Sequence, residues 1–203
     1  MHPNRKFHWQ DREAMRAFVA RAGFGTLVVQ AEDGLRAVHL PALLVGETLR
    51  FHVARGNAAH AALAAGGRAL FVVNGPDAYV SPDWYGMADR VPTWDYVSVE
   101  IEGPVRTLPE GELIGLLDDL SAEHEARLAP KPAWTRAKMD PTRFDGLLKG
   151  ITGFALEIAA WRGTRKLGQD KPDHARGGVA AALAALGRAD MAALYADAEA
   201  ERA

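Results

Sequence analysis

The spacing of hydrophobic positions changes along the chain and separates helical from extended segments. The first segment is helical, because four apolar side chains recur at the spacing of one helix face: Met15, Phe18, Val19 and Ala22. Asp11 stands where a capping residue belongs, and Gly23 and Gly25 mark the end of this predicted helix. After the glycines, apolar side chains follow the period of a strand.

Three predicted strands form an antiparallel meander over residues 24–30, 35–45 and 48–53. The first two are joined by Glu32-Asp33-Gly34, and an Asp-Gly pair favours a hairpin turn because it accepts positive φ. Pro41 lies within the second strand, which indicates a sheet edge or a bulge at that point. We expect the meander to begin an antiparallel sheet.

Further strands are predicted over residues 70–74, 97–105 and 154–158, and residues 79–81 are expected to be extended. The strand over 97–105 has the clearest alternation, with apolar residues at every second position. One face of this strand is therefore predicted to be buried and the other solvated. Its alternating residues are Val97, Val99 and Ile101 against Ser98, Glu100 and Glu102.

Helices are predicted between and after these strands. Asn57 is a candidate N-cap for a short alanine-rich helix that ends at Gly66-Gly67. Pro109 opens a second helix with one leucine stripe, and a short segment surrounds Phe144 and Leu148. The chain from Pro172 onward is helical and rich in alanine.

This order of elements predicts a mainly β, α+β fold with six antiparallel strands that close into a small barrel with peripheral helices. A doubly wound parallel sheet is not favoured. We assign residues 1–170 to the barrel domain. Residues 171–203 form a helical C-terminal extension that packs on the barrel or on a partner subunit.

Alanine changes the meaning of the composition. The chain has 203 residues, 48% of them hydrophobic, but 38 of these are alanines, which bury little area. Residues 54–69 and 174–203 together hold 21 of the 38 alanines, so the dilution falls on predicted helices and not on strands. Such helices can lie close to the barrel or to a second copy, and we expect a homodimer to complete the burial.

Charge and cysteine content exclude several classes of protein. There are 24 basic and 26 acidic residues, which argues against coating nucleic acid by bulk charge. No cysteine is present, so disulfides, thiolate metal sites and cysteine nucleophiles are excluded. No apolar run approaches the roughly 18–20 residues of a membrane span, and the start of the chain lacks a signal-peptide core. A cytoplasmic protein without a membrane partner is expected.

Aromatic side chains are concentrated between residues 79 and 96. Five of these eighteen residues are aromatic, against 8% for the whole chain, and they are interleaved with Ser, Thr, Asp and Pro. Aromatic faces beside short hydrogen-bonding groups suit a planar polar ring such as a flavin, a base or a haem. The alternative is a long loop that packs its own aromatic side chains.

Two further segments are candidates for binding an anion. Residues 52–57 place Arg55 where a strand meets a helix start, which favours a phosphate, although an ordinary capped turn is the alternative. Residues 162–188 carry six basic and two acidic side chains, which permits contact with DNA without requiring it. His39 is interpreted as a structural histidine, and the spacing of the histidines predicts no metal site.

Several of these motifs resemble the PaiB family, known as FMN-binding negative transcriptional regulators. The resemblance extends from about residue 7 to 185. It implies an FMN-binding split barrel related to pyridoxamine-phosphate oxidases, in a homodimer with flavin sites at the subunit interface. The segments that carry it are His39-Leu40-Pro41, His52 to Asn57, Tyr79 to Tyr85, Val91 to Tyr96, Gly153-Phe154 and Lys166 to Pro172.

The resemblance also implies roles for residues of these motifs. Arg55 and Asn57, in the motif that begins with His52, would lie near the FMN phosphate, and Lys166 and Gln169 would approach the ring from the partner subunit. The residues implied to border the ring are Tyr79, Ser81, Trp84, Tyr85, Thr93, Trp94 and Tyr96. No catalytic residue is assigned.

Four residues depart from the family pattern. Asp83 stands where the family tends to have serine, Asp95 and Asp170 stand in place of asparagine, and Gly168 stands in place of serine. The three carboxylates would each oppose an anionic phosphate by ~1 kcal/mol at partial burial, and FMN affinity is expected to be weakened.

The functions that remain are a PaiB-type negative regulator or flavin-dependent sensor, a flavin oxidoreductase acting on a small substrate, and a cofactor-free barrel that serves as an interaction module. The sequence does not decide whether the protein is an enzyme. Contact with DNA stays open, but the net charge of −2 does not favour it.

Overall fold

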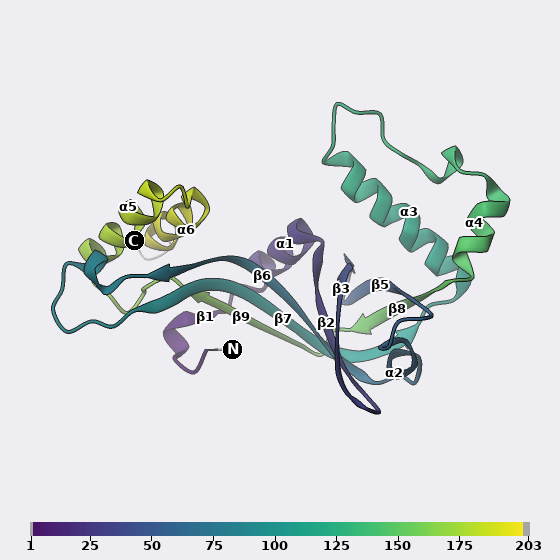
Figure 1. The fold of residues 1–203 in the computed structure, drawn as a ribbon, viewed down its shortest axis with the longest axis horizontal. Helices are drawn as coiled ribbons and strands as arrows, with labels where there is room; N and C mark the ends of the chain where they lie inside the picture. Colours follow the sequence, from purple (N-terminus) through teal and green to yellow (C-terminus); the bar gives the residue numbers. More distant parts are fainter. Residues whose placement is uncertain (1, 201–203) are drawn as a thin grey trace. The chain divides into compact units, whose positions relative to one another are not determined.

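The computed structural model describes residues 2–200, with side chains up to residue 196 (Figure 1). Met1 and residues 201–203, the outer ends of the two predicted domains, lie outside the described residues. The chain forms two compact units. We call Arg12–Val73 with Glu100–Trp161 the larger unit. The smaller unit contains the chain up to Asp11, Asn74–Val99 and the chain from Arg162 onward.

The larger unit holds most of the strands. Its elements are α1 (Arg12–Ala22), β2 (Phe24–Ala31), β3 (Gly34–Pro41), β4 (Leu43–Val45), β5 (Thr48–Ala54), α2 (His60–Ala64), α3 (Glu110–Ala126), η3 (Arg136–Lys138), α4 (Pro141–Leu148) and β8 (Ile151–Glu157). Three strands contribute residues to both units: β6 (Arg68–Val80), β7 (Thr93–Thr107) and β9 (Ala160–Lys166). The smaller unit adds η1 (Arg5–Phe7), β1 (His8–Trp9), η2 (Pro82–Tyr85), α5 (Asp173–Ala185) and α6 (Ala189–Ala200).

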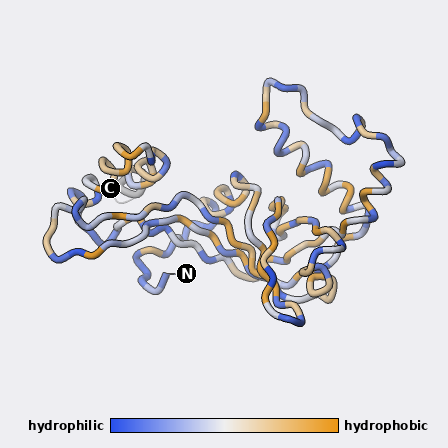
Figure 2. The backbone as a smooth tube through the Cα atoms, viewed as in Figure 1, coloured by the Kyte–Doolittle hydropathy of each residue, from blue (hydrophilic) through white to orange (hydrophobic). Residues whose placement is uncertain are grey.

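The strands pair in the order β3-β2-β6-β7-β8-β5-β4, and β9 pairs with β7 and with the short β1. The β2–β3, β2–β6, β4–β5, β5–β8 and β7–β8 pairs are all antiparallel. The predicted mixed fold with an antiparallel sheet and flanking helices is confirmed. Figure 2 shows the hydrophilic turn between β2 and β3 and the hydrophobic positions along the strands.

Strands β5, with alternating burial, and β8, with four consecutive buried residues, build the core of the larger unit. Phe51 and Phe154 are register partners, both fully buried, and their rings stack with centroids 5.8 Å apart. Leu49 and Leu156 form the equivalent buried pair two residues further along. On α3 a leucine stripe is buried, as its spacing predicts, and Leu116 and Leu120 of this stripe pack with Leu108 and Ala155.

The core of the smaller unit lies between α5, α6, η2 and the end of β6. Its cluster includes Val80, Tyr85, Leu167, Val179 and Tyr195. Helix α5 packs on η2, and Gly178 makes this packing possible because a Cβ atom there would lie 2.3 Å from the Trp84 carbonyl oxygen. The predicted C-terminal helices are therefore present, and they lie on the aromatic segment that follows β6.

The sheet has nine strands and not the predicted six. The predicted strand over 35–45 is two strands, because Ala42 leaves the ladder and its N–H donates to the Gly23 carbonyl oxygen at 3.0 Å. Residues 70–74 and 79–80 belong to one long strand, β6, whose apolar pattern is broken by polar residues and Pro76, and Ser81 lies just beyond its end. The sequence analysis missed β1 and β9, which carry no apolar alternation.

Pro41 and Asn57 were predicted to lie at a strand edge or bulge and at a helix N-cap. Pro41 ends β3, which lies at one end of the strand order, so the prediction of an edge strand is confirmed. Asn57 is not the N-cap of a helix, since α2 begins at His60, and its Oδ1 instead accepts from the Ala59 N–H at 2.9 Å. None of the helices within residues 2–200 combines the length and apolar character that a bilayer-spanning segment needs.

Candidate functional site

The residues singled out in the sequence fall into two groups. His52, Arg55 and Asn57 belong to the larger unit, at the end of β5 and just beyond it. The second group belongs to the smaller unit and consists of Tyr79, Ser81, Trp84, Tyr85, Thr93, Trp94, Tyr96, Lys166 and Gln169. Each group is described by itself.

The Lys166 ammonium, at the end of β9, has its hydrogen bonds within its own unit. It donates to the Thr93 hydroxyl, to the Trp94 carbonyl oxygen and to Asp95 Oδ1, the last at 3.0 Å. An ammonium group has three donors, and all three are used. Lys166 therefore binds Thr93, Trp94 and Asp95, residues of one motif, to the end of β9.

Asp95 is buried, with only 1% of its surface exposed, and both of its oxygens have partners. Oδ1 forms the ion pair with Lys166, and Oδ2 accepts the hydroxyl hydrogen of Tyr195 from α6. Burial raises the pKa of the Tyr195 phenol, and the Asp95 charge raises it further, so this hydroxyl remains a donor. The negative charge of Asp95 is thus paired with a counter-charge inside its own unit.

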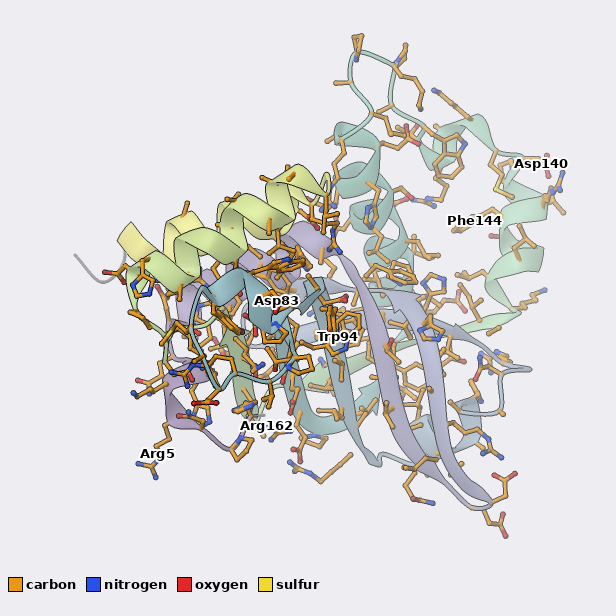
Figure 3. All side chains as sticks on the ribbon, turned by 60° about the vertical axis from the view of Figure 1, so that its left-hand side comes forward. Arg5, Asp83, Trp94, Asp140, Phe144 and Arg162 are labelled. Atoms are coloured by element: carbon orange, nitrogen blue, oxygen red, sulfur yellow. The ribbon has the colours of Figure 1, made fainter. Side chains whose placement is uncertain are left out.

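The aromatic side chains of the second group have two different environments. Tyr85 is buried, and Trp84 packs against the same cluster beneath α5 and α6. Tyr79 and Trp94 are about half exposed, at 49% and 57%, with ring centroids 6.4 Å apart in an edge-to-face arrangement. Figure 3 labels Trp94 on β7. Self-packing therefore accounts for Trp84 and Tyr85 but leaves the Tyr79–Trp94 pair open to a planar partner.

Tyr85 also lines a polar cavity of about 230 Å³ together with Arg90, Thr93 and Lys166. Burial raises the pKa of its phenol to about 12, with a further contribution from the nearby Asp95 and Asp170 carboxylates. The ammonium of Lys171 lies 5.7 Å from the centroid of the Tyr85 ring. We call this cavity the Tyr85 pocket.

Several residues near this pocket maintain the local backbone. Gln169 donates to the Arg165 carbonyl oxygen and accepts from the Leu167 N–H at 2.8 Å, so its amide closes a turn. Gly168 has φ of +66°, a left-handed conformation that favours glycine over the serine of the family pattern. Ser81 accepts from the Asp83 N–H at 3.4 Å at the start of η2, and Tyr96 is half-buried on β7.

The other two aspartates that depart from the family pattern lie outside the core. Burial of Asp170 opposes its ionisation, but the hydrogen bond and charge of Lys171 outweigh it and hold the pKa of this carboxyl below its usual range. Asp83 is exposed on η2, which packs against α5 (Figure 3). Exposed carboxylates are screened by solvent and affect a bound anion weakly.

Arg55 lines a second cavity, of about 430 Å³, in the larger unit. Lys149, Thr152 and Glu110 share this cavity with four apolar side chains and Gly153. Within residues 2–200 neither Arg55 nor Lys149 forms an ion pair, and the Thr152 hydroxyl lies 2.9 Å from His60 Nε2. Two unpaired cations against one carboxylate give this cavity a net positive charge, which suits an anion. We call it the Arg55 cavity.

His52 lies apart from Arg55, in a smaller cavity of about 220 Å³ beside α3 that also contains His124 and Trp134. Its Nδ1 is buried and has no hydrogen-bond partner. Desolvation lowers the pKa of His52, so its neutral form is favoured. Within the described part of the chain, no cluster of three His, Cys, Asp or Glu residues could hold a metal ion.

The sequence analysis missed three residues that contribute to these sites: Lys149, Arg90 and Tyr195. Lys149 stands next to Gly150 at a helix end, where a cation is usually explained by its favourable interaction with the helix dipole. Arg90 lies in the connector between η2 and β7, and Tyr195 belongs to an apolar helical stripe. The role of Tyr195 could not be predicted from a local pattern, because its partner Asp95 lies 100 residues away in the chain.

The chain was compared with known proteins. A family described as “Putative FMN-binding domain” matches residues 1–160. The protein is 29% identical over 169 residues to protease synthase and sporulation protein PAI 2 of Bacillus subtilis, covering 81% of this chain and 80% of the relative. The resemblance to the PaiB family is thereby confirmed.

Solved structures support the fold. The FAD and heme binding protein of Mycobacterium smegmatis matches with a TM-score of 0.59 and 22% identity, covering 79% of this chain and 74% of that one. The flavocytochrome Anf3 of Azotobacter vinelandii matches with a TM-score of 0.57 and 15% identity, covering 82% and 73%. The fold is that of the flavin-binding split barrels, and the chain belongs to the family described as “Putative FMN-binding domain”.

Proposed function

We propose that this protein binds FMN, with the flavin phosphate in the Arg55 cavity. The observation that carries the proposal is the pair of unpaired cations, Arg55 and Lys149, beside the Thr152 hydroxyl. Guanidinium, ammonium and hydroxyl groups are the donors that phosphate oxygens take in proteins. A cavity of about 430 Å³ also falls within the usual range for ligand sites.

Within the smaller unit, Tyr79 and Trp94 are exposed aromatic neighbours, and the resemblance to the PaiB family implies that residues of this motif border a flavin ring. Lys166 acts indirectly in this proposal. Its bonds to Thr93, Trp94 and Asp95 hold the motif that carries Trp94, and Gln169 fixes the turn behind it. A bound flavin would supply one- or two-electron transfer, and the protein residues would bind and orient it.

The proposed role is that of a flavin-dependent sensor or negative regulator of the PaiB type, as a cytoplasmic homodimer. The similarity to PAI 2 supports this reading. With a net charge of −2, any regulation is expected to be indirect and not through tight DNA binding. The second candidate is a flavin oxidoreductase acting on a small substrate, and two structural neighbours are an FAD and heme binding protein and a flavocytochrome.

Flavin binding is tested by titrating FMN fluorescence with the purified protein. Arg55→Ala and Lys149→Ala should each weaken binding about tenfold or more, because each removes a charge-assisted hydrogen bond worth roughly 1.5–3 kcal/mol. Arg143→Ala removes an exposed cation from the same unit and serves as the control. Protein that neither quenches FMN nor absorbs in the flavin region would contradict the proposal.

The role is tested separately once flavin is bound. Steady-state turnover with a nicotinamide donor would identify an oxidoreductase, whereas reduction without turnover would favour a sensor. A gel shift with promoter DNA that weakens as salt is raised would identify direct DNA contact. The homodimer is checked by measuring the mass in solution.

A further inference from the structure

The Tyr85 pocket contains polar groups that the flavin proposal does not use. Some of its charges are already paired: Lys166 with Asp95, and Lys171 with Asp170. The other polar side chains of the lining are available to a ligand.

Three lining groups are free to donate. Tyr85 is 4% exposed and lines the cavity, and its hydroxyl makes no hydrogen bond to any described residue. Arg90 lines the cavity too and, among residues 2–200, takes part in no ion pair. The Thr93 oxygen accepts from Lys166, which leaves its own hydrogen for a ligand. All three lack an acceptor.

The formal charges of the lining side chains balance, because three cations stand against three carboxylates: Arg90, Lys166 and Lys171 against Asp89, Asp95 and Asp170. Arg176 of α5 is 2% exposed, and its Cγ lies 3.6 Å from the position of a Cβ on Gly168, which lines the pocket. Its Nε has no hydrogen-bond partner, but its Nη1 lies 3.7 Å from Asp173 Oδ1, so the charge of Arg176 is paired. Asp89 and Arg90 are both exposed on the rim, and solvent screens the two charges alike. Recognition of a ligand therefore depends on the geometry of the three free donors.

The volume of the pocket and its apolar lining restrict the size and kind of ligand that it can hold. About 230 Å³ holds roughly seven water molecules, which suits a molecule of a few carbon atoms and lies below the usual size of a flavin site. Phe7 and Val91 provide apolar contacts for a short carbon chain. The planar guanidinium of Arg90 matches a carboxylate with two parallel hydrogen bonds.

We propose that the Tyr85 pocket binds a small organic carboxylate, held by Arg90, the Tyr85 hydroxyl and the Thr93 hydroxyl. The Arg55 cavity, which holds the proposed phosphate site, shares no lining residue with this pocket, so the inference does not depend on the phosphate site. The ligand is either a substrate or an effector, and both share this recognition chemistry.

The experiment titrates the full chain with propionate at constant ionic strength and follows the Arg90 side-chain and Tyr85 ring resonances by NMR. Propionamide, which has the same shape without the charge, is the control ligand and should bind at least tenfold more weakly. Arg90→Gln and Tyr85→Phe should each weaken propionate binding fivefold or more. Arg143→Gln, which removes a cation of the larger unit, should leave it unchanged.

Three outcomes would overturn the proposal: no saturable shift with propionate, equal binding of propionamide, or binding that both pocket variants leave intact. Inorganic phosphate binding as tightly as propionate would also overturn it, because the site would then select charge and not a carboxylate. Retention of the wild-type unfolding midpoint shows that each variant is folded. Arg55→Ala should retain propionate binding even where it loses FMN, which separates this failure from that of the flavin proposal.

Discussion

Asp95 is a carboxylate with almost no contact with solvent, and its neighbours determine whether its charge can be tolerated. Lys166 supplies the opposite charge and Tyr195 the remaining hydrogen bond. The PaiB pattern has asparagine at this position, which needs no counter-charge. We therefore expect Asp95 and Tyr195 of α6 to be energetically coupled.

A double-mutant cycle measures this pairing. Tyr195→Phe should lower the free energy of unfolding by about 1.5–3 kcal/mol, the value of a hydrogen bond to a charged group. Asp95→Asn should cost about 3–5 kcal/mol, because it removes the counter-charge of Lys166. The double variant should cost less than the sum, by about 0.5–3 kcal/mol, as measured by urea unfolding.

Tyr79→Phe is the matched control for this cycle, since Tyr79 is a half-exposed tyrosine of the same unit. It should change stability by no more than about 0.5 kcal/mol. Additive effects of the Asp95 and Tyr195 substitutions would show that the two side chains are not coupled.

His52 gives a pH dependence whose sign is fixed by burial. The pKa of His52 is lowered in the folded state, whereas the unfolded chain takes up the proton near the ordinary value of 6.5. Its contribution to stability is therefore complete above pH 6.5 and is lost as the pH falls through the folded-state pKa. Urea midpoints measured between pH 7.5 and about 5 should fall less steeply for His52→Gln than for the wild type.

The exposed His174 provides the comparison, and His174→Gln should keep the wild-type slope. If His52→Gln retained the full pH dependence, the desolvation of His52 would not be the cause of it.

At the scale of elements, the contact between α5 and η2 depends on one missing side chain. A Cβ on Gly178 would lie 2.3 Å from the carbonyl oxygen of Trp84, a distance that requires the helix or the turn to move. The neighbouring Gly177 faces open space, with nothing within 4 Å of a Cβ. Two adjacent helical glycines thus have opposite structural roles.

Alanine substitutions separate these roles. Gly178→Ala should lower the free energy of unfolding by about 1–3 kcal/mol, the usual cost of overpacking. Gly177→Ala should raise it by about 0.5–1 kcal/mol, because alanine is the better helix former. Thermal unfolding of the two variants tests both, and equal effects would contradict the close approach of α5 to Trp84.

At the scale of the whole molecule, residues 171–203 complete a core whose other residues come from much earlier in the chain. Val80 and Tyr85 pack with Val179 and Leu183 of α5. We propose that the boundary at residue 170 marks a C-terminal extension in sequence but not a separately folding part.

Deleting residues 171–203 tests this proposal. Hydrogen exchange should lose protection in residues 74–99, which pack on α5 and α6, and keep it in the strands of the larger unit. Unchanged protection of residues 74–99 in the shortened chain would show that these residues fold without the extension.

The parts of the molecule that could be predicted are those with a local pattern. The β2–β3 hairpin follows from Asp33-Gly34, and the α3 stripe follows from its leucine spacing. The sequence predicts two separate segments where the structure has the single strand β6, because residues 74–77, which include Pro76, interrupt the apolar pattern. In the structure, pairing with neighbouring strands keeps β6 continuous. Local pattern carries no information about such pairing.

The sequence predicted which motifs belong to the candidate site, but it did not predict which of their residues are in contact. The sequence identified Lys166, Thr93 and Trp94, yet their hydrogen bonds join residues more than 70 positions apart. Arg55 could be recognised from its place after a strand, whereas Lys149 comes near it only through the pairing of β5 with β8. Long-range pairing is what brings the functional side chains together.

The bond between Tyr195 and Asp95 also affects the order of events during synthesis. Asp95 and Lys166 leave the ribosome well before α6, so the Oδ2 atom of Asp95 must stay hydrated until the last helix has been made. Domains fold from the N-terminus as they emerge, but this buried carboxylate cannot be closed off from water until translation is nearly finished. Chains that stall or end before α6 would also leave apolar residues such as Val80 and Leu167 without part of their cover, and exposed apolar surface is what chaperones recognise.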